Sequence, residues 1–315
     1  MKLINKMLLA AVLAIAATCF VTSTFAQKQK SKEELFKEIV TLSNTKKPED
    51  TEKAYQLSKE FLNRFPKEKD ENAQKLKKFV KGYRENSFFK AYEEKKFADV
   101  FAIGKEILAD EPDNISISMN LGYAGYDAML KSNDKSFGDD SIKYSKQTLQ
   151  LFEAGKVPAS FAPFSNKDEA FAWMYYVIGF FSTEKDPKES AINFYKSTLY
   201  ESSIKKTAQP YYVIAFYYES VYEKMSAEFS AKSKAKTIDD AQINAETEKI
   251  NIVLDQMIDA YARAYKFGEI EKNPSKDEWK KRLTEVYLFR KRPEAALDAY
   301  LNYVMATPLK DPGGF

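Results

Sequence analysis

Apolar residues recur along this chain at the spacing of amphipathic helices, from about residue 35 to the C-terminal end. Within residues 35–40 and again within residues 253–261 they stand three and four positions apart, which places them on one face of a helix. We find no run that alternates between apolar and polar positions, and only 10 glycines and 11 prolines occur in 315 residues, too few for turn-rich β folds. The pattern therefore predicts an all-α protein.

The helices are expected to come in pairs, because one spacing of bulky, small and aromatic residues repeats. The last copy is the clearest, and its positions are Trp279, Leu283, Thr284, Tyr287, Ala296, Tyr300 and Pro308. This pattern resembles the tetratricopeptide repeat, a helix–turn–helix unit of about 34 residues. The resemblance implies a right-handed superhelical solenoid of stacked antiparallel helix pairs, a fold whose usual task is to hold partner proteins.

Earlier segments repeat the same intervals with less fidelity. Gly179 precedes Ala191 by twelve residues, the interval that also separates Thr284 from Ala296. Small residues allow helices to approach closely, so we expect one helix–helix contact at each of these two pairs. We also expect a single array over residues 27–315. Its approximate repeats are 35–68, 81–114, 115–155, 172–205, 209–268 and 277–310.

Three stretches interrupt the repeats, namely residues 131–140, 154–168 and 226–247. Such insertions are expected to connect helices at one edge of a repeat array. The last of them contains a basic stretch, residues 232–236, which we interpret as a solvated loop rather than a binding patch.

Residues 1–26 are expected to be a signal peptide. A positively charged start precedes an apolar run over residues 7–21, and the small residues Thr24 and Ala26 mark a cleavage site. The apolar run is short for a membrane span, which needs about 20 residues. No later segment reaches that length without charge. The mature chain is therefore expected to be exported, with no transmembrane segment.

The single cysteine, Cys19, lies in this peptide. Ala16 and Thr18 stand where a bacterial lipobox carries Leu and a small residue such as Gly, Ala or Ser. Lipid anchoring at Cys19 is therefore the less favoured alternative, and we expect a periplasmic or secreted protein. The mature chain then has no cysteine, which excludes disulfides and thiol chemistry.

The charge pattern argues against nucleic acid as a partner. Lysine and arginine number 49 against 46 acidic residues, and the two signs are interspersed along the expected helices. Removing Lys2 and Lys6 with the signal peptide leaves 47 − 46 = +1. Interspersed charges of this kind are typical of solvated helix faces.

The sequence provides little material for catalysis. Histidine is absent, which removes the commonest general base and the commonest metal ligand. Two adjacent pairs of acids, Asp139–Asp140 and Asp239–Asp240, precede expected helices, where acids suit the helix N-terminus. We therefore expect a protein that is not an enzyme and has no cofactor or metal.

Aromatic residues are the most conspicuous candidates for function. The chain has 20 tyrosines and 23 phenylalanines, concentrated in segments 161–181 and 209–222, whose helices are aromatic nearly all round. If Gly179 and Ala215 face the second helix of each pair, another set of side chains turns to the groove that the first helices line in the resembled family. This set is Trp173, Tyr176, Phe180, Tyr212, Phe216 and Glu219. The alternative is that these aromatic rings pack between helices as core.

The leading hypothesis is an exported scaffold or adaptor that binds a protein or peptide partner in the bacterial cell envelope. A helical module that binds a solute or a glycan through segments 161–181 and 209–222 is the alternative from another class. A component of outer-membrane assembly is a third reading, since residues 54–66 are similar to the repeats of such lipoproteins.

Overall fold

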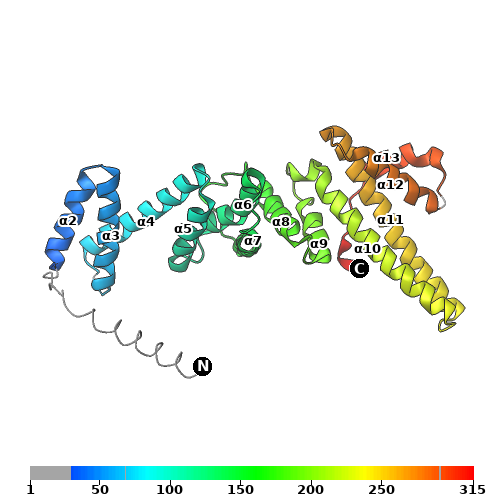
Figure 1. Ribbon diagram of the computed structural model, residues 1–315, viewed down its shortest axis with the longest axis horizontal. Coiled ribbons are helices and arrows are strands. Elements are labelled where there is room, and N and C mark those ends of the chain that lie inside the picture. Colours follow the sequence, from blue (N-terminus) through cyan, green and yellow to red (C-terminus); the bar gives the residue numbers. More distant parts are fainter. Residues whose placement is uncertain (1–29, 68, 291) are drawn as a thin grey trace, which may run out of the picture. The chain divides into compact units, whose positions relative to one another are not determined.

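The computed structural model describes residues 30–67, 69–290 and 292–315, and within these ranges the chain forms twelve α-helices and no strand (Figure 1). The helices are α2 (Lys32–Asn44), α3 (Pro48–Arg64), α4 (Glu71–Glu93), α5 (Phe97–Asp110), α6 (Ile115–Ser132), α7 (Gly138–Glu153), α8 (Lys167–Ser182), α9 (Pro187–Ser197), α10 (Ala208–Lys234), α11 (Asp240–Glu271), α12 (Lys276–Phe289) and α13 (Leu297–Met305). The all-α prediction is confirmed.

The predicted signal peptide, with Cys19, lies outside the described residues and stays a prediction. None of the helices in the described ranges combines the length and the apolar character that crossing a bilayer requires. The chain divides into two compact units, and the border between Tyr83 and Arg84 falls inside α4. The single array over residues 27–315 stays a prediction.

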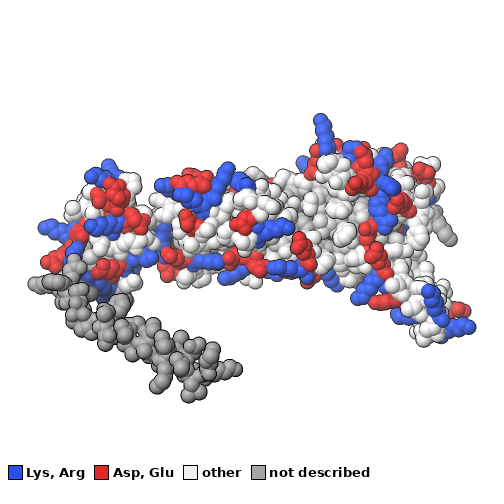
Figure 2. All heavy atoms as spheres, viewed as in Figure 1, with Lys and Arg blue, Asp and Glu red and all other residues white. Residues whose placement is uncertain are grey.

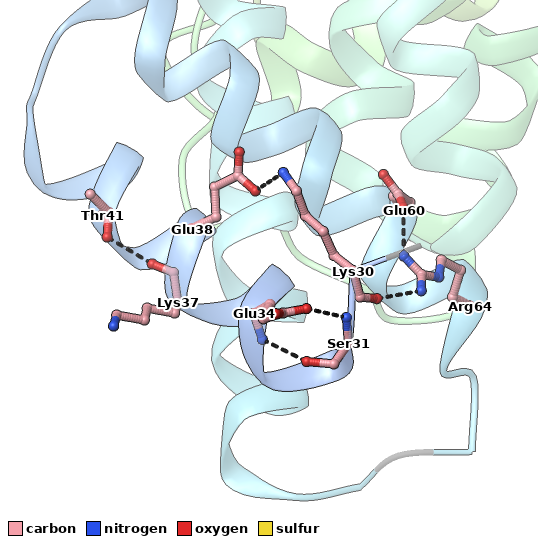
Figure 3. A network of polar contacts seen from close by, with 8 residues as sticks. All are labelled: Lys30, Ser31, Glu34, Lys37, Glu38, Thr41, Glu60 and Arg64. Atoms are coloured by element: carbon pink, nitrogen blue, oxygen red, sulfur yellow. Dashed lines mark hydrogen bonds and ion pairs between the residues drawn. The ribbon is translucent and has the colours of Figure 1, made fainter. Parts of the chain in front are cut away.

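The first unit holds α2, α3 and the first part of α4. Ser31 and Glu34 form a capping box at the start of α2: the Ser31 hydroxyl accepts from the Glu34 N–H at 3.2 Å, and the Glu34 carboxylate accepts from the Ser31 N–H at 2.8 Å (Figure 3). Arg64, at the end of α3, donates to the Lys30 carbonyl at 2.7 Å and to Glu60 at 2.8 Å. The bond from Arg64 to Lys30 joins the end of α3 to the start of α2. A helix cap such as that of Ser31 contributes about 1 kcal/mol.

In the second unit the helices from α5 to α12 pack mainly on their neighbours in sequence. The most extensive contacts are within the pairs α6–α7, α8–α9 and α10–α11, and α6 also contacts α8. The core follows this order, because apolar side chains on one face of each helix meet those of the next. The observed architecture is therefore a row of sequentially packed helix pairs.

Small residues stand where these pairs come closest. A Cβ atom at Gly179 would lie 3.1 Å from the Ser190 carbonyl oxygen and 3.0 Å from the Phe194 ring, both on α9. The Ser190 hydroxyl donates to the Gly179 carbonyl at 2.8 Å, and Ala191 is fully buried beside it. The predicted α8–α9 contact at Gly179 and Ala191 is confirmed.

The corresponding prediction for Thr284 and Ala296 is wrong. Both residues are only partly buried, and the Thr284 hydroxyl donates within its own helix to the Lys280 carbonyl at 2.9 Å. Pro293 is extended, a 3₁₀ turn follows up to Ala296, and α13 begins only at Leu297. α13 then packs mainly on α11 instead of α12. The copy with the clearest sequence pattern therefore does not form a regular pair of adjacent α-helices.

The predicted insertion over residues 226–247 is also wrong for most of its length. α10 continues to Lys234, α11 begins at Asp240, and only residues 235–239 connect them (Figure 1). Residues 226–247 contain neither glycine nor proline, so helix continues through most of the stretch and breaks only at residues 235–239, where Lys236 has a positive φ of 52°. Lys232 forms an ion pair with Glu246 at 2.7 Å across the resulting hairpin.

The other two connecting stretches are close to the prediction. The segment between α6 and α7 spans residues 133–137, and that between α7 and α8 spans residues 154–166, with a cis peptide bond at Ala162–Pro163. The acidic pairs take the predicted positions: Asp139 and Asp140 lie in the first turn of α7, while Asp239 caps α11.

Candidate binding surfaces on the first helices

Trp173, Tyr176 and Phe180 lie on the side of α8 that meets α6. Trp173 packs edge-on against Tyr123 with ring centroids 5.2 Å apart, and Phe180 packs edge-on against Tyr126 at 5.1 Å. Tyr176 contacts Tyr126 at 5.4 Å. The structure therefore brings the three predicted residues of α8 together, with two α6 tyrosines as their neighbours.

The three residues of α8 differ in how far their side chains are buried. Tyr176 is only 7% exposed and also packs edge-on against Phe194 of α9 at 5.1 Å, whereas Trp173 and Phe180 are partly exposed. Burial raises the pKa of Tyr176 far above its ordinary value, and it raises the pKa of Tyr123 to about 12, with a smaller contribution from the charge of Asp127. Tyr176 is therefore a neutral core residue, while Trp173 and Phe180 keep accessible surface.

The predicted residues of α10 face α12. Tyr212 stacks on Trp279 with ring centroids 5.1 Å apart and planes 25° from parallel. Glu219, seven residues later, forms an ion pair with Arg282 of α12. Phe216 lies between these two contacts in sequence and is 57% exposed. Tyr212 and Glu219 thus join α10 to α12, and Phe216 is free to meet another molecule.

A groove continues from these contacts along α10, α11 and α12. Tyr222 and Phe289 meet edge-on across it at 6.2 Å, and Phe289 is 63% exposed. The groove has a volume of about 280 Å³. Its lining residues are Tyr222, Leu254, Met257, Arg282, Glu285, Val286 and Phe289. It combines an apolar floor with a cation and an anion at the edge.

A second hollow, of about 350 Å³, lies where α6 and α8 meet the segment before α8. Tyr123, Phe164 and Trp173 line it together with Glu169, which lies one turn before Trp173 on α8. The Glu169 carboxylate accepts from the Trp173 indole N–H at 3.1 Å. It also accepts from the backbone N–H of Ser203 at 2.9 Å and from the Ser203 hydroxyl.

The face of the second unit drawn in Figure 2 has an uncharged area over α8, α9 and α10, between regions where lysines, arginines and acids alternate. Interspersed charges therefore do not cover the whole surface. The aromatic helices account for much of the difference, because segments 167–182 and 208–222 carry few charged residues.

Sequence reasoning did not identify several aromatic residues of these two surfaces. Tyr123 and Tyr126 alternate with Gly122 and Gly125 on α6, and this interleaving of large and small residues was a usable signal. Trp279 was read only as a position of the repeat. Which rings are neighbours depends on how α6 meets α8 and how α10 meets α12, and a single helix pattern does not contain that information.

Comparison with known proteins finds no family model, no curated protein and no solved structure that matches this chain.

Proposed function

We propose that this chain is an exported adaptor of the bacterial cell envelope that binds a segment of a partner protein along its first helices. The observation that carries the proposal is the exposure of two aromatic rings. Phe216 is 57% exposed one turn before Glu219, whose partner Arg282 lines a groove in which Phe289 is 63% exposed. Exposed aromatic side chains next to apolar pockets are typical anchors for a partner. The ion pair of Glu219 with Arg282 at the same groove supplies polar groups that orient a peptide.

Several features support a tetratricopeptide-like superhelix as the scaffold of this surface. Helices pack in sequential pairs, α6 contacts α8, and Gly179 stands at the close approach of α8 and α9. In this proposal α6, α8, α10 and α12 are the first helices of successive units and form one binding face. The role is binding rather than catalysis, and export follows from the signal peptide expected over residues 1–26.

A site-specific photo-crosslinking amino acid at position 216 or 289 tests the proposal in cells that produce the protein natively. We expect a discrete crosslinked product from both positions, identified by mass spectrometry. Leu199 is a matched control, since it is apolar and 56% exposed but follows α9. Equal crosslinking from all three positions, or none from positions 216 and 289, contradicts the proposal.

A glycan- or solute-binding module is the second candidate. The hollow beside Trp173 favours it, because the faces of tryptophan and tyrosine rings suit sugar rings and the volume of about 350 Å³ falls in the range of small-molecule sites. A saccharide that binds at Trp173 together with the absence of crosslinks from position 216 would favour this candidate. A part in outer-membrane assembly is a special case of the adaptor, with the assembly machinery as partner.

A further inference from the structure

The hollow beside Trp173 has the geometry of an aromatic corner. Tyr123 stands nearly perpendicular to both other rings, at 76° to Phe164 and 79° to Trp173, with centroids 5.3 and 5.2 Å away. Phe164 and Trp173 are within 23° of parallel, with centroids 6.4 Å apart. Aromatic faces carry negative partial charge, and rings arranged in this way attract a cation placed against them.

Glu169 adds a full negative charge to this corner. All of its hydrogen bonds come from neutral donors: the Trp173 indole and the backbone and hydroxyl of Ser203. Among the described residues, no lysine or arginine forms an ion pair with it. An ionised carboxylate has about four acceptor sites, so three bonds leave one for a donor from outside the protein. The partly buried charge lies in the first turn of α8 and is hydrogen-bonded, but it has no cationic side chain as a partner among the described residues.

The described lysines of the second unit that contact aromatic rings contact rings outside this hollow. Lys196 is over Tyr175 at 5.5 Å and Lys167 is over Phe171 at 5.6 Å. These pairs involve rings other than those that line the hollow. Within the described part of the chain, no lysine or arginine therefore lies over the three rings of this hollow or pairs with its carboxylate.

We propose that this hollow binds a basic side chain, lysine or arginine, of the partner peptide. The inference rests on the proposed function and specifies the chemistry of the partner. The ammonium or guanidinium group lies against the three rings and donates a hydrogen bond to the free acceptor site of Glu169. A neutral saccharide would use the ring faces but leave the carboxylate charge uncompensated. The exposed residues Pro163, Ser165 and Ser203 at the rim leave the hollow open to a side chain that enters from solvent.

Fluorine NMR on 5-fluorotryptophan-labelled protein tests this directly, because the chain contains two tryptophans, Trp173 and Trp279. Trp279→Phe assigns the two signals. The probes are N-acetyl-lysine methylamide and N-acetyl-arginine methylamide, with N-acetyl-norleucine methylamide as the uncharged match. We expect a saturable shift of the Trp173 signal with the two basic probes, no shift with the norleucine probe, and no shift of Trp279.

Glu169→Gln should weaken binding of the basic probes at least tenfold, while Glu278→Gln, an exposed carboxylate whose loss changes the net charge equally, should leave it unchanged. Circular dichroism and a melting curve confirm that both variants fold. Equal shifts with the norleucine probe, or lysine binding that Glu169→Gln leaves unaltered, overturn the proposal. Binding of free tetramethylammonium or of glucose in preference to the lysine probe overturns it as well. Crosslinking from position 216 does not depend on Glu169, so this inference and the adaptor proposal fail separately.

Discussion

Tyr212 of α10 stacks on Trp279 of α12, with ring centroids 5.1 Å apart. The two rings bridge helices that are separated in sequence by the whole of α11. One turn further along α10, Phe216 has no comparable cover and stays 57% exposed. The same aromatic segment thus contains a ring that holds two helices together and a ring that is available to a partner.

This difference predicts opposite effects of truncation. Phe216→Ala should change the free energy of unfolding by no more than about 0.5 kcal/mol, as surface substitutions do, yet reduce partner binding by about 2 kcal/mol or more. Tyr176→Ala should cost about 3–5 kcal/mol of stability, because it empties a buried site between α6, α8 and α9. Urea unfolding measured beside partner affinity checks both values. Similar losses of stability in the two variants would place Phe216 in the core.

A second prediction concerns the contact of α8 with α9. Gly179→Leu should destabilise the protein by about 1–3 kcal/mol, since even a Cβ atom at this position meets the Ser190 carbonyl and the Phe194 ring. Gly82 is the control: it lies inside α4, and a Cβ there meets nothing within 4 Å. Gly82→Ala should raise stability by up to about 1 kcal/mol, because alanine is the better helix former. Destabilisation by both substitutions would contradict the close approach at Gly179.

The position at which α13 begins leads to a third prediction. Ala296→Leu should change stability little, because Ala296 lies in a 3₁₀ turn before α13 and is only partly buried. Leu297→Ala should cost about 2–5 kcal/mol, because Leu297 is the first buried residue of α13. Thermal and urea unfolding of the two variants compare them. A larger loss of stability from Ala296→Leu than from Leu297→Ala would mean that Ala296 lies at a close helix–helix contact, as a regular repeat requires.

Alkaline pH should unfold the protein through its tyrosines. Burial raises the pKa of Tyr123, Tyr211 and Tyr300 to about 12, from an ordinary value of 10.0. Between pH 10 and 12 the unfolded chain has lost phenolic protons that the folded chain retains, so the free energy of unfolding falls as the pH rises. This stabilisation is fully present below pH 10. Tyrosinate absorbance followed together with helicity should show ionisation delayed until helices are lost, whereas the same titration in guanidinium should centre near pH 10. Identical titrations in both solvents would mean that these rings are solvated.

The sequence predicts those features of the fold that are determined by residues close together in the chain. Gly179 was placed correctly because a small residue within one helix and a second helix twelve residues on form a local pattern. Ala296 fits the same pattern, but extended Pro293 and the 3₁₀ turn delay α13, which then packs on α11. The prediction for residues 226–247 is wrong for most of their length because it rests on a 34-residue repeat unit, whereas the absence of glycine and proline allows helix on both sides of the turn at residues 235–239.

The candidate surfaces show the same limit. Helical spacing identified α8 and α10 as aromatic helices and selected three side chains on one face of each. It did not distinguish buried Tyr176 from exposed Phe216, because that difference depends on how other helices, α6, α9 and α12, pack against α8 and α10. Glu169 carries no sequence signal beyond that of an ordinary acid near a helix start. Its significance comes from Phe164 and Ser203, which belong to other segments.

The outer half of the α10–α11 hairpin has a consequence for how this protein can vary. None of the residues 223–252 is buried, and only Met225 and Ile250 among them pack against the core, so the part of α10 from Ser226 to Lys234, about 14 Å at 1.5 Å per residue, lies beyond it. Removing seven residues from each helix, near two full turns, would keep the remaining faces in register and leave the core untouched. The length of the α10–α11 hairpin can thus change by whole helical turns without altering the surfaces at its base.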